Sequence, residues 1–303
     1  MIELDTLATE KRNSRSHMID QLSTLDMLQV INDEDKTIAW AIEKILPRIA
    51  QAVDLIADRF RHGGRLLYMG SGTSGRLGIL DAVECPPTYS TDPALIQGLI
   101  AGGYNAIFQA QEGAEDSESL GAQDLKKQAL TDKDVVVGIS ASGRTPYVVG
   151  GLRYAAGIGA ATLSICCSPD SRIAEYSQID LCVLVGPEVV TGSTRMKAGT
   201  AQKMILNMLS TGTMIKLGKV YGNLMVDVKS SNEKLKERAR HIVMEATGCN
   251  RQAAINALTE ANGQAKPAIL IVLLHITAAE ATARLDQCHG YISCVLKENL
   301  NEQ

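Results

Sequence analysis

Aromatic side chains and long apolar runs are scarce in this chain of 303 residues. One Trp, two Phe and eight Tyr make up only 4% of the sequence, too few for a surface on which nucleic-acid bases stack. The longest strongly apolar run, Ala268 to Leu274, is closed by His275 and is far shorter than the roughly 20 residues that a membrane-spanning helix requires. Neither a binder of single-stranded nucleic acid nor an integral membrane protein is expected.

Strong charge of either sign is also missing. Thirty Lys and Arg against 34 Asp and Glu give a formal net charge of −4, so no basic surface for nucleic acid or anionic membranes is predicted. The first thirty residues lack the apolar centre of a signal peptide. The seven cysteines contain no CxxC pair and several lie inside apolar runs, which is typical of buried, reduced thiols. We expect a cytoplasmic protein.

Motifs of metal sites and of the common hydrolases and nucleotide-binding loops are absent. The five histidines are far apart and show no spacing of metal ligands (His17, His62, His241, His275 and His289). No GxSxG, HExxH or GxxxxGK[ST] pattern occurs. We therefore predict neither a bound metal nor a cofactor.

Short apolar runs do alternate with helical patterns through the middle of the chain. The candidate strands are Leu66–Met69, Leu95–Ile100, Val135–Ile139, Ala161–Cys166 and Leu181–Val185. Strands that are continuously apolar and separated by helices predict a parallel sheet covered on both faces. With right-handed crossovers, the fold class is α/β: a three-layer αβα sandwich with a five-stranded, doubly wound parallel sheet.

The two ends of the chain differ from this middle region. Residues 1–33 are polar and weakly periodic, which predicts an N-terminal arm, and a helical pattern runs from Glu34 to Arg61. A Gly- and Thr-rich loop over 186–199 leads into a long helix, and from about Ser231 the pattern is helical throughout. We predict three parts: the arm 1–33, an α/β domain 34–229 and an all-helical C-terminal domain 230–303.

The first strand is followed by a loop rich in glycine and hydroxyls, Gly70–Gly75 (GSGTSG). The pattern GxGxxG suggests a dinucleotide site, but that site also needs an acidic residue at the end of the second strand. Here the second strand runs into Ala101-Gly102-Gly103. Hydroxyls together with backbone N–H groups at a helix N-terminus favour a single phosphate group instead.

The third strand is followed by a second loop of the same character, Ser140–Pro146 (SASGRTP). An alternative is that Ser142 or Thr145 only caps the following helix. Two hydroxyl-rich loops at the carboxyl ends of strands in one sheet favour a phosphate site, since open α/β sheets bind ligands at that edge.

Together the two loops resemble the phosphosugar-binding signature of the sugar isomerase (SIS) domain. The stretch 186–203 (GPEVVTGSTRMKAGTAQK) is more specific and resembles a signature shared by glucokinase regulatory proteins and bacterial N-acetylmuramic acid 6-phosphate etherases. Residues 9–13 (TEKRN) and the chain length favour the etherases, since the vertebrate regulators are longer and duplicated. The resemblance runs from the arm to the helical tail and implies the SIS fold for residues 34–229.

The resemblance also implies which acidic residues are catalytic: they fall on Glu84 and Glu115. An alternative for the segment around Glu115 is a set of acids stabilised by a helix dipole, which we expect for Asp116 and Glu118. An alternative for Glu84 is a solvated loop residue, although Pro86-Pro87 downstream predicts an extended, rigid backbone there.

The implied reaction cleaves the D-lactyl ether of N-acetylmuramic acid 6-phosphate to N-acetylglucosamine 6-phosphate and D-lactate. The aldehyde of the opened sugar acidifies the C2 proton, its removal lets the C3 oxygen leave as protonated lactate, and water then adds at C3. Glu84 corresponds to the family's proton donor, and Glu115 is the candidate base at C2. Exchanging the two roles satisfies the sequence equally well.

The ligand contacts are predicted on the two loops: Ser71, Gly72, Thr73, Ser74, Ser140, Ser142, Gly143 and Thr145. Arg195 and Lys197 are candidates for contacting the lactyl carboxylate or the enolate, with a pair of surface charges as the alternative. The resemblance further implies a homodimer with the site near the interface. A phosphosugar isomerase and a non-catalytic phosphosugar sensor remain alternatives; a DNA-binding regulator lacks the required basic face.

Overall fold

The computed structural model describes residues 10–169, 171–228 and 233–301. The chain forms two compact units, one of Met1–Val83 with Pro93–Ser210 and one of Glu84–Asp92 with Thr211–Gln303. We describe each unit by itself. The predicted domain boundary between residues 229 and 230 lies outside the described residues, as do the first nine residues of the predicted arm, so the three-part division stays a prediction.

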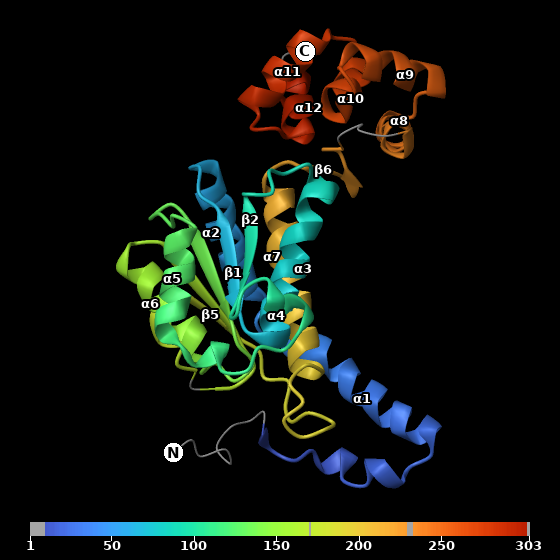
Figure 1. The fold of residues 1–303 in the computed structure, drawn as a ribbon. Coiled ribbons are helices and arrows are strands. Elements are labelled where there is room, and N and C mark those ends of the chain that lie inside the picture. Colours follow the sequence, from blue (N-terminus) through green and yellow to red (C-terminus); the bar gives the residue numbers. More distant parts are fainter. Residues whose placement is uncertain (1–9, 170, 229–232, 302–303) are drawn as a thin grey trace. The chain divides into compact units, whose positions relative to one another are not determined.

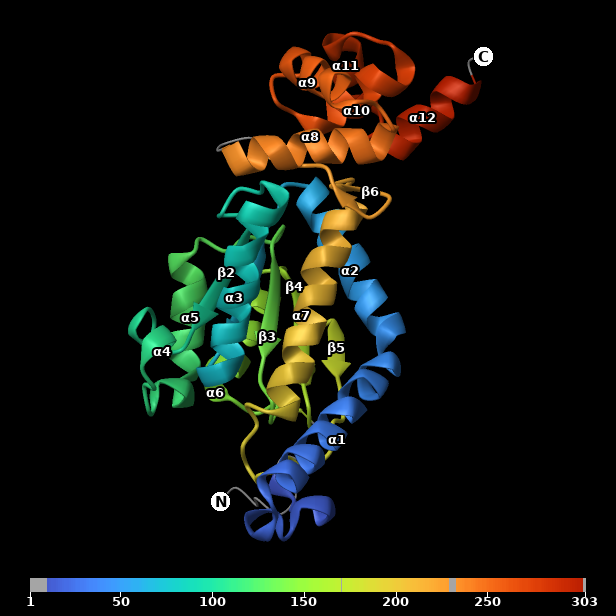
Figure 2. The same cartoon turned by 90° about the vertical axis from the view of Figure 1, so that its right-hand side faces the viewer.

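The first unit is built on a parallel sheet of five strands in the order β2-β1-β3-β4-β5 (Figures 1 and 2). In chain order the strands are β1 (Leu66–Gly70), β2 (Ile96–Ile100), β3 (Val135–Ile139), β4 (Ala161–Cys166) and β5 (Ile179–Cys182). Every residue of β1, β3 and β4 is buried, as continuous apolar runs require. The predicted α/β fold class is confirmed.

The last strand lies earlier than its predicted position at 181–185. β5 pairs with β4 from Ile179, and its second residue, Asp180, lies opposite Ser164. The Ser164 hydroxyl donates a hydrogen bond to the Asp180 carboxylate at 2.6 Å. This bond accounts for a charged residue within a strand, which an apolar pattern cannot anticipate.

Helices cover both faces of this sheet. In Figures 1 and 2, α5 and α6 lie on one face, and α3 and α7 lie on the other. The helices of the middle region are α3 (Gly72–Tyr89), α4 (Asn105–Phe108), α5 (Glu118–Lys127), α6 (Pro146–Gly157) and α7 (Lys197–Lys216). The boundary between the two units falls within α3 and α7.

The N-terminal region contains two helices where one was predicted. α1 spans Thr24–Glu43 and α2 spans Leu46–Arg61. The Ser23 hydroxyl accepts a hydrogen bond from the Asp26 N–H and caps α1; Pro47, which has no N–H, lies in the first turn of α2. The helical pattern therefore begins ten residues earlier than the predicted start at Glu34.

The turn from β1 into α3 is tight, and this places the first loop. A Cβ atom on Gly70 would lie 2.8 Å from the Gly75 N atom, and one on Gly75 would lie 2.6 Å from a side-chain carbon of Ile100. Side chains at these two positions would force the helix away from the sheet. The glycines thus allow α3 to begin directly at the carboxyl edge of the sheet.

The second unit is helical, as predicted, with a small hairpin in addition. Its helices after the hairpin are α8 (Glu233–Thr247), α9 (Arg251–Glu260), α10 (Ala265–Leu274), α11 (Ala278–Gln287) and α12 (Ile292–Asn301). Their apolar faces share one core that includes Val243, Ala254 and Leu270. The hairpin strands β6 (Val220–Tyr221) and β7 (Leu224–Met225) are too short to produce an alternating pattern.

Two of the thiols expected to be reduced are joined. Cys288 and Cys294 form a disulfide, since Cys288 directly follows α11 and the turn before α12 brings the two Cα atoms to 5.7 Å from each other. The other five cysteines are not disulfide-bonded: Cys85, Cys166, Cys167, Cys182 and Cys249.

Among the described residues, no single helix is long and apolar enough to cross a membrane. Only α10 and α11 taken together reach the required length and composition, and they are bent by 108° at the break between them.

Candidate functional site

The two predicted loops meet at the carboxyl edge of the sheet and enclose a cavity of about 420 Å³. Seven of the eight predicted ligand residues line it: Ser71, Gly72, Thr73, Ser74, Ser140, Ser142 and Thr145. The remaining lining residues are Glu10, Glu115, Asp116, Ala141, Arg144, Pro146, Gly192 and Thr194. We refer to this space as the sheet-edge cavity.

The first loop presents the N-terminus of α3 to the cavity. Gly72, with a φ of +50°, is the first residue of the helix. The N–H groups of a helix's first turn have no partner within the helix, and they carry its positive end. The Ser74 hydroxyl is 8% exposed and donates to the Gln202 side chain at 2.9 Å, so its proton is already engaged. This loop can therefore hold an anion mainly through backbone N–H groups.

The second loop is held by its own hydroxyls. The Ser140 Oγ lies 2.8 Å from the Thr145 Oγ1, and it accepts a hydrogen bond from the Gly143 N–H at 3.1 Å. Thr145 occupies the N-cap position of α6 without making a capping hydrogen bond. The alternative that Thr145 only caps the helix therefore does not describe the structure.

Gly143 is the one predicted ligand residue that does not line the cavity. Its φ is +69°, and a Cβ atom there would lie 2.4 Å from the Ser171 Oγ. Its N–H donates to Ser140. Gly143 therefore shapes the loop, and its N–H group, which was predicted to contact the ligand, bonds to Ser140.

Glu115 joins the first loop to the acidic segment. It lies in a short 3-10 helix, Ala114–Asp116, and its carboxylate accepts a hydrogen bond from the Ser71 hydroxyl at 2.7 Å. The side chain is exposed on the cavity wall. Glu115 is thus placed where a carboxylate can act on a ligand that the loops hold.

Glu10 and Arg144 are lining residues that the sequence interpretation did not identify. Glu10 approaches from the N-terminal region, and its Oε2 would lie 3.1 Å from a Cβ atom on Gly192. Hydrogen bonds from the Asn13 side chain to the Pro187 carbonyl (3.3 Å) and from Ser16 to the Val189 carbonyl (2.8 Å) hold this segment in place. The sequence signal that could have identified Glu10 is its place in residues 9–13, which carry part of the family resemblance.

Neither Arg195 nor Lys197 lines the sheet-edge cavity. Arg195 is exposed. Lys197 is 2% exposed, and its ammonium pairs with the Glu34 carboxylate. The predicted contact of Lys197 with substrate is therefore not available in this structure, and the alternative of a surface charge does not hold for it either.

Lys197 belongs to a buried network that anchors the start of α7. The Glu188 carboxylate accepts hydrogen bonds from the N–H groups of Lys197 and Ala198, both at 2.9 Å. Burial alone would raise the pKa of the Glu34 carboxyl, but the hydrogen bond and charge of Lys197 outweigh this and lower that pKa. Arg15 also pairs with Glu34. The network fixes the loop that precedes α7.

Glu84 lies on a helix and not on an extended segment. α3 continues through Pro86 and Pro87 to Tyr89. The Ser90 N–H donates to the Pro86 carbonyl at 3.0 Å. Glu84 is exposed, belongs to the second unit and is not among the residues that line the sheet-edge cavity.

A smaller hollow of about 160 Å³ adjoins the sheet-edge cavity, and the two share Ser71, Gly72 and Glu115. Arg76 lines it and donates to the carbonyls of Ala106 and Ile107, at 2.8 and 2.9 Å. These bonds fix the segment between β2 and Glu115. A ligand that contacts Glu115 has room on both sides of that carboxylate.

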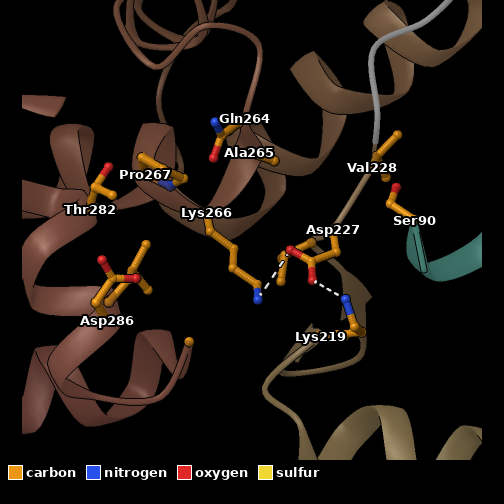
Figure 3. Close-up of a pocket in the computed structure, with 13 residues that line it drawn as sticks. Ser90, Lys219, Asp227, Val228, Gln264, Ala265, Lys266, Pro267, Thr282 and Asp286 are labelled. Carbon is orange, nitrogen blue, oxygen red and sulfur yellow. Dashed lines mark hydrogen bonds and ion pairs between the residues drawn. The ribbon is translucent and has the colours of Figure 1, made fainter. Parts of the chain in front are cut away.

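The second unit has its own cavity, of about 360 Å³ (Figure 3). Lys219 and Lys266 point toward one carboxylate, Asp227, at 2.8 and 3.1 Å. Burial lowers the pKa of the Lys266 ammonium, although the attraction of Asp227 opposes this. The two lysines share one carboxylate, and Asp286 lines the same space. We refer to this space as the helical-unit cavity.

Comparison with known proteins adds to these observations. A model of the glucokinase regulatory protein N-terminal SIS domain matches residues 48–156, and a SIS domain model matches residues 113–212. An N-acetylmuramic acid 6-phosphate etherase of Clostridium beijerinckii is 56% identical over 98% of this chain and 98% of that protein. An N-acetylmuramic acid 6-phosphate etherase of Pasteurella multocida is 60% identical over 95% of this chain and 96% of that protein. The structure of a phosphoheptose isomerase from Francisella tularensis matches this one with a TM-score of 0.48. The match covers 63% of this chain and 98% of that one, at 13% sequence identity.

Proposed function

The chain belongs to the N-acetylmuramic acid 6-phosphate etherase family, and from this premise we propose that it converts N-acetylmuramic acid 6-phosphate to N-acetylglucosamine 6-phosphate and D-lactate. The observation that carries the proposal is the sheet-edge cavity, in which two loops rich in hydroxyls lie beside a carboxylate. We also propose a cytoplasmic location: five of the seven cysteines form no disulfide, and only Cys288 and Cys294 are joined.

In this proposal the 6-phosphate binds between the two loops. The N–H groups at the start of α3 and the hydroxyls of Ser140, Ser142 and Thr145 supply donors of the kind that phosphate oxygens accept. The phosphate is remote from the reacting carbons. Its binding energy therefore serves to orient C2 and C3 against Glu115.

Glu115 is the base at C2. The aldehyde at C1 of the opened sugar acidifies the C2 proton, and Glu115 takes this proton. The hydrogen bond from Ser71 holds the carboxylate in position at 2.7 Å. The electron pair left at C2 then expels the C3 oxygen, which leaves as lactate once an acid has given it a proton. Water adds to C3 of the unsaturated aldehyde and completes the reaction.

Glu84 is the acid, and it comes from a second copy of the chain. Glu84 follows Gly72 by twelve residues of continuous helix, which at about 1.5 Å per residue is about 18 Å. Gly72 lines the cavity, and Glu84 follows it by about three turns along α3. A homodimer with the site near its interface supplies Glu84 from the partner copy. The exposed apolar side chains of Leu25, Leu28 and Trp40 on α1 support such an interface.

The first experiment follows D-lactate release from N-acetylmuramic acid 6-phosphate by purified protein, with Glu84→Gln and Glu115→Gln in parallel. Wild type should release lactate and both variants very little. If wild type binds the sugar phosphate but releases no lactate, the etherase proposal fails. Exchange of the C2 proton with solvent would then distinguish an isomerase from a sensor, because only the isomerase exchanges it.

A second experiment tests the origin of Glu84. The two variants are co-expressed with different tags, and the hybrid dimer is purified through both tags. If each site takes Glu84 from the partner copy, one of the two sites in a hybrid is intact, and it should show about half of the wild-type rate. A hybrid as inactive as its parents would contradict the shared site, while tagged wild-type dimers control for the tags.

A further inference from the structure

Away from the sheet-edge cavity, three potential metal ligands meet at the carboxyl ends of β4 and β5. The Sγ atoms of Cys166 and Cys182 and a carboxylate oxygen of Asp180 all lie within 4.8 Å of one another. We propose that these three side chains bind one thiophilic divalent cation of the zinc type per chain.

The strand register produces this arrangement. Cys166 of β4 lies directly opposite Cys182 of β5. Asp180 precedes Cys182 by two residues in the same strand, so both side chains point to the same face of the sheet. The Asp180 Oδ1 accepts from the Ser164 hydroxyl at 2.6 Å, and the Cys166 thiol approaches the same oxygen at 3.7 Å. A hydroxyl that orients a ligand carboxylate is a typical outer partner in metal sites.

Ser168 supplies a fourth ligand atom. Its carbonyl accepts from both thiols, at 3.5 Å from the Cys166 Sγ and 3.3 Å from the Cys182 Sγ, and the residue is 1% exposed. A cation held by the two sulfurs would therefore have this buried carbonyl oxygen within reach.

The chemistry of the ligand set selects the cation. A divalent cation binds the two sulfurs as thiolates, releases their two protons to solvent and compensates the charge of the carboxylate. Two sulfur ligands and two oxygen ligands suit tetrahedral Zn²⁺, while Mg²⁺ and Ca²⁺ prefer oxygen alone.

This proposal departs from the prediction that the chain binds no metal. That prediction used only the spacing of histidines and the absence of CxxC. The ligands here come from paired strands and lie 14 to 16 residues apart in sequence, a separation that carries no motif. Only the register between β4 and β5 brings them together.

The test uses Co²⁺ as a spectroscopic probe and Zn²⁺ as a competitor. Cys288, Cys294 and Glu298 form a second group of this kind, so the experiments use a Cys288→Ser/Cys294→Ser background, reduced and stripped of metal. One Co²⁺ per chain should produce a thiolate-to-cobalt charge-transfer band, and Zn²⁺ should abolish it. Cys182→Ser and Asp180→Asn should each weaken binding at least about tenfold, and Cys249→Ser, which removes a half-buried thiol of the second unit, should not.

Ser164, whose hydroxyl orients the Asp180 carboxylate, allows a second test of metal binding. Ser164→Ala should weaken Zn²⁺ binding by about 10- to 100-fold while leaving the cobalt spectrum unchanged, because it alters the orientation of a ligand and not its identity. Absence of the charge-transfer band in the folded background protein would overturn the proposal. So would a band that survives Cys182→Ser with unchanged affinity. Circular dichroism of each variant establishes that it is folded.

Discussion

The sheet-edge cavity and the helical-unit cavity are close in size, about 420 Å³ and 360 Å³, but their polar groups are arranged differently. In the helical-unit cavity two lysines already share the carboxylate of Asp227. In the sheet-edge cavity the two loops line the wall with hydroxyls and with the N-terminus of α3, beside the Glu115 carboxylate. The kind of polar group and the way it is paired therefore distinguish the two spaces, and volume does not.

The largest effect is expected when the carboxylate of the sheet-edge cavity is neutralised. Glu115→Gln keeps the shape and a partner for Ser71 but removes the base, so kcat for lactate release should fall by about 10²- to 10⁴-fold. Asp116→Asn is the matched control. Asp116 lines the same cavity one residue away, and we assign to its carboxylate only the stabilisation of a helix terminus. A comparable loss of kcat in both variants would contradict the assignment.

The next effect concerns a buried carboxylate in the core of the first unit. Asp81 accepts hydrogen bonds from the Tyr68 hydroxyl at 2.9 Å and from Ser210 at 3.0 Å. Burial raises its pKa to about 6, against the lowering effect of these bonds and of Lys203. Because the pKa is higher in the folded state than in the unfolded chain, the wild type loses stability as the pH rises from about 4 to about 6.

Asp81→Asn removes this titration. The free energy of unfolding of the variant, relative to that of wild type, should therefore rise by up to about 3 kcal/mol between pH 4 and pH 7. Urea denaturation followed by circular dichroism at both pH values measures the difference. A difference that is constant across this range would show that Asp81 does not titrate there.

A substitution in the helical-unit cavity is expected to change the stability of the protein. Asp227→Asn leaves two partly buried ammonium groups without their shared carboxylate, and we expect the free energy of unfolding to fall by about 2 kcal/mol. Asp286→Asn, which alters another acid of the same cavity, should change it little. If Asp227→Asn is as stable as wild type, the ion pairs there do not hold the hairpin and α10 together, and the contrast between the two cavities weakens.

The sequence predicted correctly those features that depend on one short, continuous segment of the chain. The runs at Val135–Ile139 and Ala161–Cys166 are buried strands because both faces of a central parallel strand are covered. Both loops that line the sheet-edge cavity could be located from the sequence, because each carries its hydroxyls and glycines within seven residues or fewer.

Features that depend on distant partners were not predictable in this way. Lys197 was expected at the substrate, yet it pairs with Glu34, 163 residues away, and no local pattern reveals such a contact. Glu10 reaches the cavity only because Asn13 and Ser16 bind the carbonyls of another segment. The helix through Pro86 was missed because proline rules describe helix interiors better than helix ends.

The smallest effect tests whether the two loops of the sheet-edge cavity have different tasks. Ser71 touches Glu115, whereas Ser142 accepts a hydrogen bond from the Arg144 N–H at 3.3 Å and has no contact with that carboxylate. Removing one hydroxyl hydrogen bond is worth about 1 kcal/mol, or roughly fivefold. Ser71→Ala should therefore lower kcat about fivefold, because the base loses its orientation, and Ser142→Ala should raise KM by a similar factor with kcat unchanged. Steady-state lactate release measures both parameters. If both variants change only KM, Ser71 serves the phosphate alone, and the hydrogen bond to Glu115 is replaced when substrate binds.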